Sequence, residues 1–475
     1  MNDSTLPRII QGGMGIAVSD WRLAHAVSSR GQLGVVSGTA IDSVFVRRLQ
    51  DGDPGGHMRR AMAAFPMPGV ADQVLARWFR PEGRAPGEKY KELSMYKQVV
   101  STLRQQTTML AMFAEVWLAK EGHGNPVGVN LLTKIQLPNL ALLYGAMLAD
   151  ADFILMGAGI PREVPGALDA MSEGRATSMR LDVENLGSGE AEVFALDPQE
   201  YWEGPPPRLK RPKFLAIIAS NSLGTMLARK ASGRVDGFIV EGPTAGGHNA
   251  PPRGAATYNE IGEPVYGERD VVDFVKLAEL GLPFWIAGGS GSPEGLDAAL
   301  AAGAVGIQVG TLFAYCDESG LAESYKRSVL EHALKGDVTV YTDPNASPTG
   351  FPFKVVDWGG NVADFEKRKR ICDLGYLRVA YKTAAGKVDY RCSAEPVDQY
   401  VKKGGATEET TGRRCLCNAL MANIGLPQVR EGGIEEPPLL TSGDDLVTIQ
   451  TFLRGRSHYG AGDVLDYLLR TSPAD

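Results

Sequence analysis

The sequence predicts an α/β fold, a (β/α)8 TIM barrel with helical insertions and an appended C-terminal region. Three observations carry this prediction: eight short apolar runs before residue 312, helix-like stretches after most of them, and glycine turns after the last two. Continuous rather than alternating apolar runs are typical of parallel strands buried on both faces. A doubly wound sheet is the alternative, but an anion site after the last two strands favours the barrel.

The predicted strands are residues 8–10, 33–36, 127–129, 153–156, 214–218, 237–240, 284–286 and 305–307. Their spacing is uneven, because two long insertions interrupt the rhythm. Residues from about 50 to 125 form a helix-rich insertion between the second and third strands. Residues 160–212 form another, with a small hairpin around 190–194. After Phe313 a long helix, about 318–334, is expected to close the barrel.

The alternation of strands and helices stops near residue 341, where prolines and glycines become frequent. We therefore divide the chain into a barrel over residues 1–340 and an appended region over residues 341–475. The appended region keeps apolar content, so we expect it to pack on the barrel and to end in a helix near 464–469.

The last two predicted strands end in glycine turns, Gly288-Gly289-Ser290-Gly291 and Gln308-Val309-Gly310-Thr311. Between them, residues 293–303 have the pattern of an amphipathic helix, with proline near its start and glycine at its end. Glycines let backbone N–H groups approach an anion closely, and a helix N-terminus adds a favourable dipole. We interpret the two turns as the phosphate cradle of a nucleotide-like cofactor.

Composition and charge exclude several classes of protein. The chain is 44% hydrophobic and 22% charged, as in ordinary globular proteins, and its net charge of −7 argues against nucleic acid as a partner. The one basic run, residues 367–370, is expected to be a solvated face. No apolar stretch approaches the ~20 residues that span a bilayer, and residues 1–5 lack a signal-peptide pattern. We therefore expect a cytoplasmic protein without a membrane partner.

His248 is the candidate catalytic residue. It ends the loop Glu241-Gly242-Pro243-Thr244-Ala245-Gly246-Gly247-His248, which follows the sixth predicted strand. Catalytic residues of β/α barrels lie at the carboxyl ends of the strands, and an imidazole can take or hold a proton near neutral pH. The alternative is a structural role, in which His248 only closes a glycine turn. Because the predicted phosphate cradle lies on the same face, we favour the catalytic role.

Other strand ends carry glycines or small polar residues on the same face. In Gln11-Gly12-Gly13-Met14-Gly15, backbone amides can meet a flat heteroaromatic ring, with Met14 as a soft apolar contact. Asn130 ends the third strand with an amide that can donate to phosphate and accept from an N–H. Gly157-Ala158-Gly159 and Ser220 end the fourth and fifth strands. With the strand end that carries the His248 loop, five strand ends predict a ring of ligand contacts.

These residues together resemble a known family, the nitronate monooxygenase (2-nitropropane dioxygenase-like) flavoproteins, whose barrel the flavin-dependent enoyl-acyl-carrier reductases share. The motifs that carry the resemblance are Ile10-Gln11-Gly12-Gly13-Met14-Gly15, Gly128-Val129-Asn130, Ala245-Gly246-Gly247-His248, Ala287-Gly288-Gly289 and Gln308-Val309-Gly310-Thr311-Leu312-Phe313. The resemblance covers most of residues 7–335 in motif order.

The resemblance implies a barrel that holds FMN without a covalent bond and passes electrons from an alkyl nitronate to dioxygen, with no metal and no external reductant. His248 matches the family's active-site histidine. The flavin-contacting motif positions are matched by Asn130, Gly246, Gly289, Gln308, Gly310 and Thr311. With the glycine-turn and strand-end residues, the predicted cofactor-binding set also includes Gly13, Met14, Glu241, Gly247 and Gly288.

The loop before His248 departs from the family pattern. Glu241 and Thr244 stand where the family usually has Gln and Glu, and a Glu at the first position is more similar to the enoyl reductase branch. A carboxylate near the flavin disfavours an anionic reduced ring unless it is paired or turned away. Arg253 in the following loop can pair with an anionic substrate or the phosphate, or it is simply a surface arginine.

Four of the five cysteines, Cys372, Cys392, Cys415 and Cys417, fall in the appended region. Four thiolates can form a tetrahedral zinc site. Because only one close pair exists and its spacing is C-x-C, we expect buried, unligated thiols and no metal site.

Three functions follow from the sequence. The first is an FMN-dependent nitronate monooxygenase that acts on a small molecule with dioxygen. The second is an NAD(P)H-dependent FMN enoyl-acyl-carrier reductase, alone or as part of a synthase. The third is a docking role, in which the insertion and the appended region bind an acyl-carrier or synthase partner and the barrel is one component. A homo-oligomer is a further possible partnership.

Overall fold

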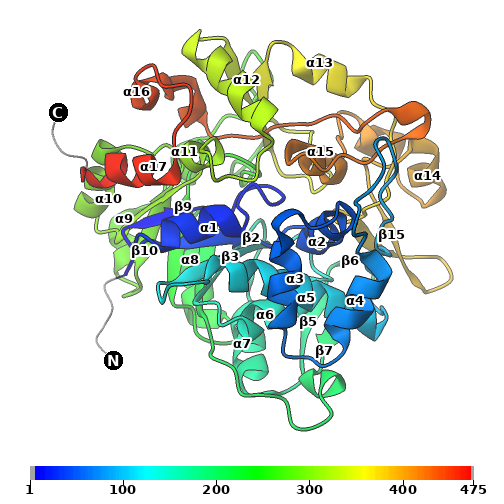
Figure 1. The fold of residues 1–475 in the computed structure, drawn as a ribbon. Coiled ribbons are helices and arrows are strands. Elements are labelled where there is room, and N and C mark those ends of the chain that lie inside the picture. The colour runs from blue at the N-terminus through cyan, green and yellow to red at the C-terminus, as the bar shows by residue number, and fades with distance from the viewer. Residues whose placement is uncertain (1–5, 472–475) are drawn as a thin grey trace.

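A closed eight-stranded parallel barrel forms the centre of the protein (Figure 1). The computed structural model describes residues 6–471, apart from the side chains of residues 363 and 364. The barrel strands are β1 (Ile9–Gln11), β2 (Gly34–Ser37), β3 (Val127–Leu132), β4 (Phe153–Gly157), β8 (Lys213–Ile218), β9 (Gly237–Glu241), β10 (Phe284–Ala287) and β11 (Gly306–Val309). Their order is β1-β11-β10-β9-β8-β4-β3-β2, and all neighbours are parallel. The N–H of Gln11 donates to Leu33 (2.9 Å) and that of Leu33 to Ile9 (3.1 Å), which closes the ring. The predicted barrel is confirmed.

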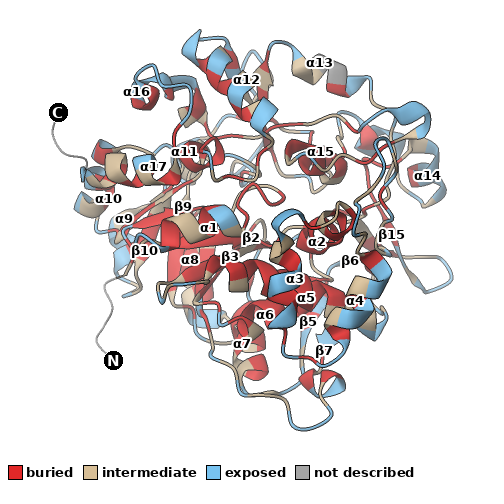
Figure 2. Ribbon diagram, in the orientation of Figure 1, coloured by how far each residue is buried: buried red, intermediate tan, exposed pale blue. Residues whose placement is uncertain are grey.

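Both faces of the barrel strands are buried, which explains their continuous apolar sequences (Figure 2). Inside the barrel, Ile10, Val35, Leu155, Ile239 and Trp285 belong to one apolar cluster. The outward-facing residues join a second, larger cluster with the surrounding helices. Burial on both faces is what a parallel sheet surrounded by helices requires.

The barrel helices follow their strands. They are α1 (Trp21–Ser28), α2 (Ile41–Gln50), α6 (Asn139–Leu148), α7 (Val164–Ser172), α8 (Asn221–Lys230), α9 (Phe274–Ala278), α10 (Pro293–Ala301), α11 (Thr311–Ala314) and α12 (Glu323–Leu334). The side chain of Ser292 caps α10 by accepting from the N–H of Gly295 at 2.9 Å. The predicted helix at 318–334 starts later than expected, at Glu323. Just before this helix, the backbone N–H of Asp317 donates to Tyr459 and that of Gly320 donates to Val18, both at 2.9 Å.

The two insertions lie beneath one side of the barrel in Figure 1. The first contains η1 (Pro54–Gly56), α3 (His57–Ala63), α4 (Val70–Trp78) and the mostly buried α5 (Thr102–Ala119), with an irregular stretch between α4 and α5. The second contains β5 (Thr177–Leu181), β6 (Val183–Glu184), β7 (Glu192–Leu196) and η2 (Pro198–Tyr201). A hairpin is present there, as β5 and β7 pair antiparallel.

The C-terminal region packs against both the barrel and the second insertion. Its elements are β12 (Val338–Asp343), β13 (Phe353–Trp358), α13 (Asn361–Glu366), β14 (Val379–Lys382), β15 (Val388–Arg391), α14 (Val397–Lys402), η4 (Thr407–Thr410), α15 (Leu416–Asn423), η5 (Glu431–Gly433), η6 (Asp444–Thr448), α16 (Gln450–Leu453) and α17 (Ala461–Leu469). β14 pairs with β15 and, in parallel, with β6 of the second insertion. The domain division at residue 340 stays a prediction.

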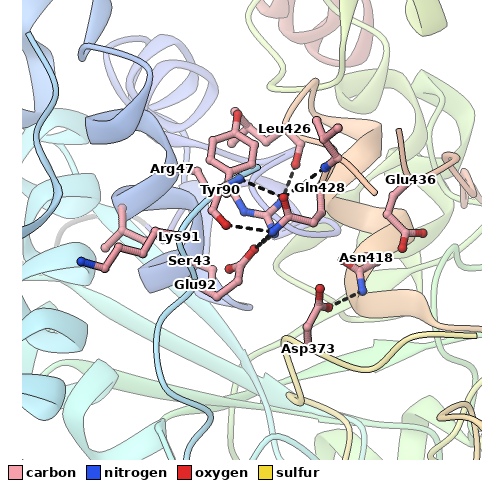
Figure 3. Close-up of polar contacts among 12 residues, drawn as sticks. Ser43, Arg47, Tyr90, Lys91, Glu92, Asp373, Asn418, Leu426, Gln428 and Glu436 are labelled. Carbon is pink, nitrogen blue, oxygen red and sulfur yellow. Dashed lines mark hydrogen bonds and ion pairs between the residues drawn. The ribbon is translucent and has the colours of Figure 1, made fainter. Parts of the chain in front are cut away.

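A buried polar network joins α2 to the C-terminal region (Figure 3). The guanidinium of Arg47, fully buried, donates to the carbonyl of Leu426 and pairs with Glu92 at 2.6 Å. The side chain of Gln428 bonds both backbone groups of Tyr90, at 2.9 and 3.1 Å. Removing one partner of such a buried pair leaves an uncompensated charge, so this network fixes where the region sits.

The basic run at 367–370 is only in part the solvated face that we expected, because Lys367 and Lys369 are exposed but Arg368 and Arg370 are not. Arg368 has 7% of its side chain exposed and pairs with the buried Glu436 at 2.8 Å. Arg370 donates to the carbonyls of Ser393 (3.1 Å) and Thr410 (2.7 Å). α13 ends at Glu366, so the run forms no helical face. Within residues 6–471, none of the helices combines the length and apolarity that crossing a membrane would need.

Candidate active site at the carboxyl ends of the strands

One cavity at the carboxyl ends of the barrel strands brings together every residue of the predicted site. Its walls include Gly13, Met14, Asn130, Glu241, Gly246, Gly247, His248, Gly288, Gly289, Gln308, Gly310 and Thr311. Each lies at the end of a barrel strand or in the loop that follows, and the closed barrel gathers these ends at one rim. Their roles toward a cofactor remain a prediction.

The glycine turn after β10 needs its glycines. Gly288 and Gly289 have φ of +85° and +68°, in the left-handed region that side chains disfavour. A Cβ on Gly288 would also come within 3.0 Å of the backbone nitrogen of Ala245. The turn therefore presents bare backbone to the cavity, next to the N-terminus of α10.

A carboxyl group from the C-terminal region reaches the same turn. The side chain of Asp445 accepts a hydrogen bond from the backbone N–H of Gly291, and burial raises the pKa of Asp445. The sequence contained no signal for this contact, which joins residues more than 150 positions apart.

His248 is held from two sides. Its Nε2 lies 2.6 Å from Oγ of Ser347, and its ring packs edge-on against Phe353 with 4.9 Å between ring centroids. Burial lowers the pKa of His248 to about 4, so the imidazole is neutral at neutral pH. A neutral ring can donate from one nitrogen and accept at the other, and Ser347 helps to determine which nitrogen does which.

Glu241 ends β9 and lines the cavity. Burial raises its pKa to about 7. The acid is therefore partly protonated near neutral pH, which removes much of the negative charge that would oppose an anionic ring. A carboxyl group with this pKa can also deliver or accept a proton at working pH.

Two amide side chains on the cavity wall each carry an oxygen without a hydrogen-bond partner. Asn130 donates through Nδ2 to the carbonyl of Gly13 at 3.2 Å. Its Oδ1 and the Oε1 of Gln308 are buried and, among the described residues, have no donor. Buried acceptors of this kind are normally satisfied, so a ligand that presents N–H groups would fit them.

The C-terminal region also supplies part of the wall. The N–H of Gly247 donates to Oγ1 of Thr441 at 2.8 Å, and the N–H of Gly443 donates to Oγ1 of Thr311 at 3.2 Å. A Cβ on Gly246 would lie 2.7 Å from the carbonyl carbon of Ser442. The glycines before His248 therefore permit this close approach of two chain segments.

Two further strand ends, after β4 and β8, and the loop residue Arg253 were also candidates for ligand contact, and the structure places them differently. Gly157 and Ala158 line the cavity. Ser220 instead caps α8, accepting from the N–H of Leu223 at 3.2 Å. Arg253 is an exposed residue whose guanidinium lies 3.4 Å from Oγ of Ser222, and it does not line the cavity. Arg253 is therefore a surface arginine, the second of the two roles considered for it.

Part of the chain is similar to a known family. The family model described as nitronate monooxygenase matches residues 183–346, which include β8 to β11 and the loops of His248, Gly289 and Gln308. A probable nitronate monooxygenase of Staphylococcus saprophyticus is 32% identical over 126 residues, 26% of this chain and 34% of that protein. A 5-hydroxy-7a-methyl-1-oxo-octahydro-1H-indene-4-carboxyl-CoA dehydrogenase of Rhodococcus jostii is 29% identical over 180 residues, 38% of this chain and 44% of that protein. These matches span less than half the length of either relative.

Solved structures give a looser likeness. FabK from Thermotoga maritima superposes with a TM-score of 0.49 at 17% identity, covering 98% of this chain and 93% of that one. Nitroalkane oxidase from Streptomyces ansochromogenes gives a TM-score of 0.48 at 14% identity, covering 98% and 95%.

Proposed function

We propose that this chain, a member of the nitronate monooxygenase family by its residues 183–346, is an FMN-dependent oxidoreductase that oxidises alkyl nitronates with dioxygen. The observation that carries the proposal is the neutral, half-buried His248 in a cavity edged by glycine turns and by two amide side chains.

The residues of the cavity fit a flavin mononucleotide. Gly288, Gly289 and Gly310 would present backbone to its phosphate, and Thr311 adds a hydroxyl at the start of α11. The unpartnered oxygens of Asn130 and Gln308 would accept from ring N–H groups. When bound, FMN supplies the electron transfer from the substrate to dioxygen.

The protein residues bind the nitronate and can hold a proton beside it. His248 is neutral, so it holds a nitronate oxygen through a hydrogen bond without forming an ion pair. Ser347 keeps the ring in place through its contact with Nε2 at 2.6 Å. Glu241, with a pKa of about 7, is a second group on the cavity wall that can hold a proton at working pH.

An NAD(P)H-dependent FMN enoyl reductase is the second candidate, and Glu241 favours it. Glu241 stands at the first position of the loop, as in the enoyl reductase branch, and the structure places it on the cavity wall.

An absorption spectrum of the purified protein, followed by anaerobic addition of propionate 3-nitronate or NADPH, tests both candidates. Bleaching of a bound flavin by the nitronate alone supports the monooxygenase. Bleaching by NADPH alone supports the reductase. A colourless protein that takes up no FMN would refute both.

A further inference from the structure

Four of the five cysteines of the chain converge on one small cavity in the C-terminal region, away from the candidate active site. Cys372 lies in the loop after α13, Cys392 directly follows β15, and Cys415 and Cys417 stand at the start of α15. All four line this cavity, together with Pro348 and backbone of the 373–377 loop. We propose that these four thiols form a structural zinc site, in which four thiolates hold one Zn²⁺ ion.

Hydrogen-bond donors lie close to the sulfurs of the cluster. The side-chain amide of Asn418 lies 3.6 Å from the sulfur of Cys415. Backbone N–H groups also donate to the sulfurs: those of Tyr376 and Leu377 to Cys417, and that of Ala394 to Cys392. Donors of this kind orient metal ligands and stabilise their charge.

Positive charge lies close to the cluster as well. Four thiolates around one Zn²⁺ leave a net charge of −2, which would be costly to bury without compensation. Three guanidinium groups interact electrostatically with the sulfurs. Arg368 interacts with Cys415, Arg370 with Cys392 and Arg378 with Cys372.

The neighbouring carboxylates already have partners. Asp373 accepts from Asn418 at 2.8 Å, as Figure 3 shows, and pairs with Arg430. Glu395 pairs with Lys403 at 2.7 Å. These two acids are therefore paired with groups other than Arg370 and Arg378, while Arg368 also pairs with Glu436.

The four sulfurs must turn toward one another before they can hold an ion. In the part of the chain that the structure describes, no three cysteine, histidine or acidic side chains form a ready-made metal site, and the thiols of Cys372 and Cys392 hydrogen-bond to each other. Each sulfur turns on a single side-chain torsion with three staggered positions. Binding of the ion would replace this thiol–thiol contact, with release of the thiol protons.

The zinc site would brace the loop that holds the active-site histidine. Arg413, two residues before Cys415, donates to the carbonyls of Ser347 (2.6 Å) and Asn345 (2.9 Å). Ser347 in turn contacts His248 at 2.6 Å. Fixing residues 415–417 thus fixes the support of His248, although the metal proposal does not depend on the proposed reaction.

Metal analysis of the full-length protein tests the proposal. We expect about one zinc per chain after dialysis against a weak chelator, and loss of this zinc in Cys415→Ser and Cys417→Ser. Cys316→Ala is the matched control, because Cys316 bonds the carbonyl of Phe313 at 3.1 Å outside the cluster and should leave the zinc content unchanged.

If the serine variants do not fold, metal uptake by the wild-type protein tests the proposed zinc site. Its metal-free form should take up one Co²⁺ with the intense sulfur-to-metal absorption of a tetrathiolate. Four reactive thiols without metal uptake, or a disulfide between Cys372 and Cys392 found by mass spectrometry, would overturn the proposal. Detection of iron together with acid-labile sulfide would indicate an iron–sulfur cluster in place of zinc and would also overturn the proposal.

Discussion

Replacing Glu241 by glutamine tests whether burial, and not a chemical partner, sets the state of this acid. Burial raises the pKa of Glu241 from 4.5 to about 7. Because the folded state holds the proton more tightly than the unfolded chain, the wild-type protein loses stability as pH rises from 4.5 to 7. Above pH 7 the loss in the free energy of unfolding reaches about 3 kcal/mol, and below pH 4.5 this loss is absent. Glutamine does not ionise, so Glu241→Gln should escape the cost.

The assay is urea unfolding of both proteins at pH 5 and pH 8 in the same FMN concentration, followed by tryptophan fluorescence and by circular dichroism. We expect the variant to be more stable by about 2–3 kcal/mol at pH 8 and by less than about 1 kcal/mol at pH 5. Glu279→Gln, at an exposed position of the same barrel, serves as the control and should show neither effect. An equal difference at both pH values would refute the assignment of a buried, partly protonated Glu241.

Four further outcomes follow from the same geometry. His248→Ala should keep bound flavin but lose most turnover, and unchanged turnover would remove His248 from the mechanism. Ser347→Ala deletes the 2.6 Å contact to the imidazole and should lower kcat about tenfold with FMN affinity preserved; a change in FMN affinity alone would contradict this. Gly246→Ala forces a Cβ against the backbone of Ser442 and should cost about 1–3 kcal/mol in unfolding experiments, whereas Gly204→Ala, where the added Cβ meets open space, should cost less. Because burial lowers the pKa of His248 to about 4, His248 should contribute stability above pH 6.5 that is lost as pH falls toward 4; a wild-type protein as sensitive as His248→Ala over that range would argue against it.

The barrel and its catalytic rim could be predicted because the responsible signals are local. Continuous apolar runs such as 153–156 and 237–240 mark strands buried on both faces, and all eight predicted runs form the barrel. Each glycine turn directly follows its strand, so once the ring closes, Gly13, Asn130, His248, Gly289 and Gln308 must meet at one end. Topology alone therefore assembled that part of the cavity.

The remaining contacts depend on how distant segments pack. Ser347 reaches His248 from 99 positions away, and Asp445 reaches Gly291 from the far end of the chain. The expectation of a solvated run failed at Arg368 for the same reason: the buried Glu436 that pairs with Arg368 is 68 positions along the chain. No spacing rule links such residues, since their distance is set by the packing of whole elements.

The sequence by itself thus determined the fold class, the strand ends and the identity of the cavity's glycines and histidine. Only the tertiary structure decided that the C-terminal region completes the cavity, that burial makes His248 neutral and Glu241 partly protonated, and that four cysteines spread over residues 372–417 meet in one place. The physical reason is that periodicity and turn chemistry act over a few residues, whereas desolvation and convergence arise from the three-dimensional environment that the whole chain creates.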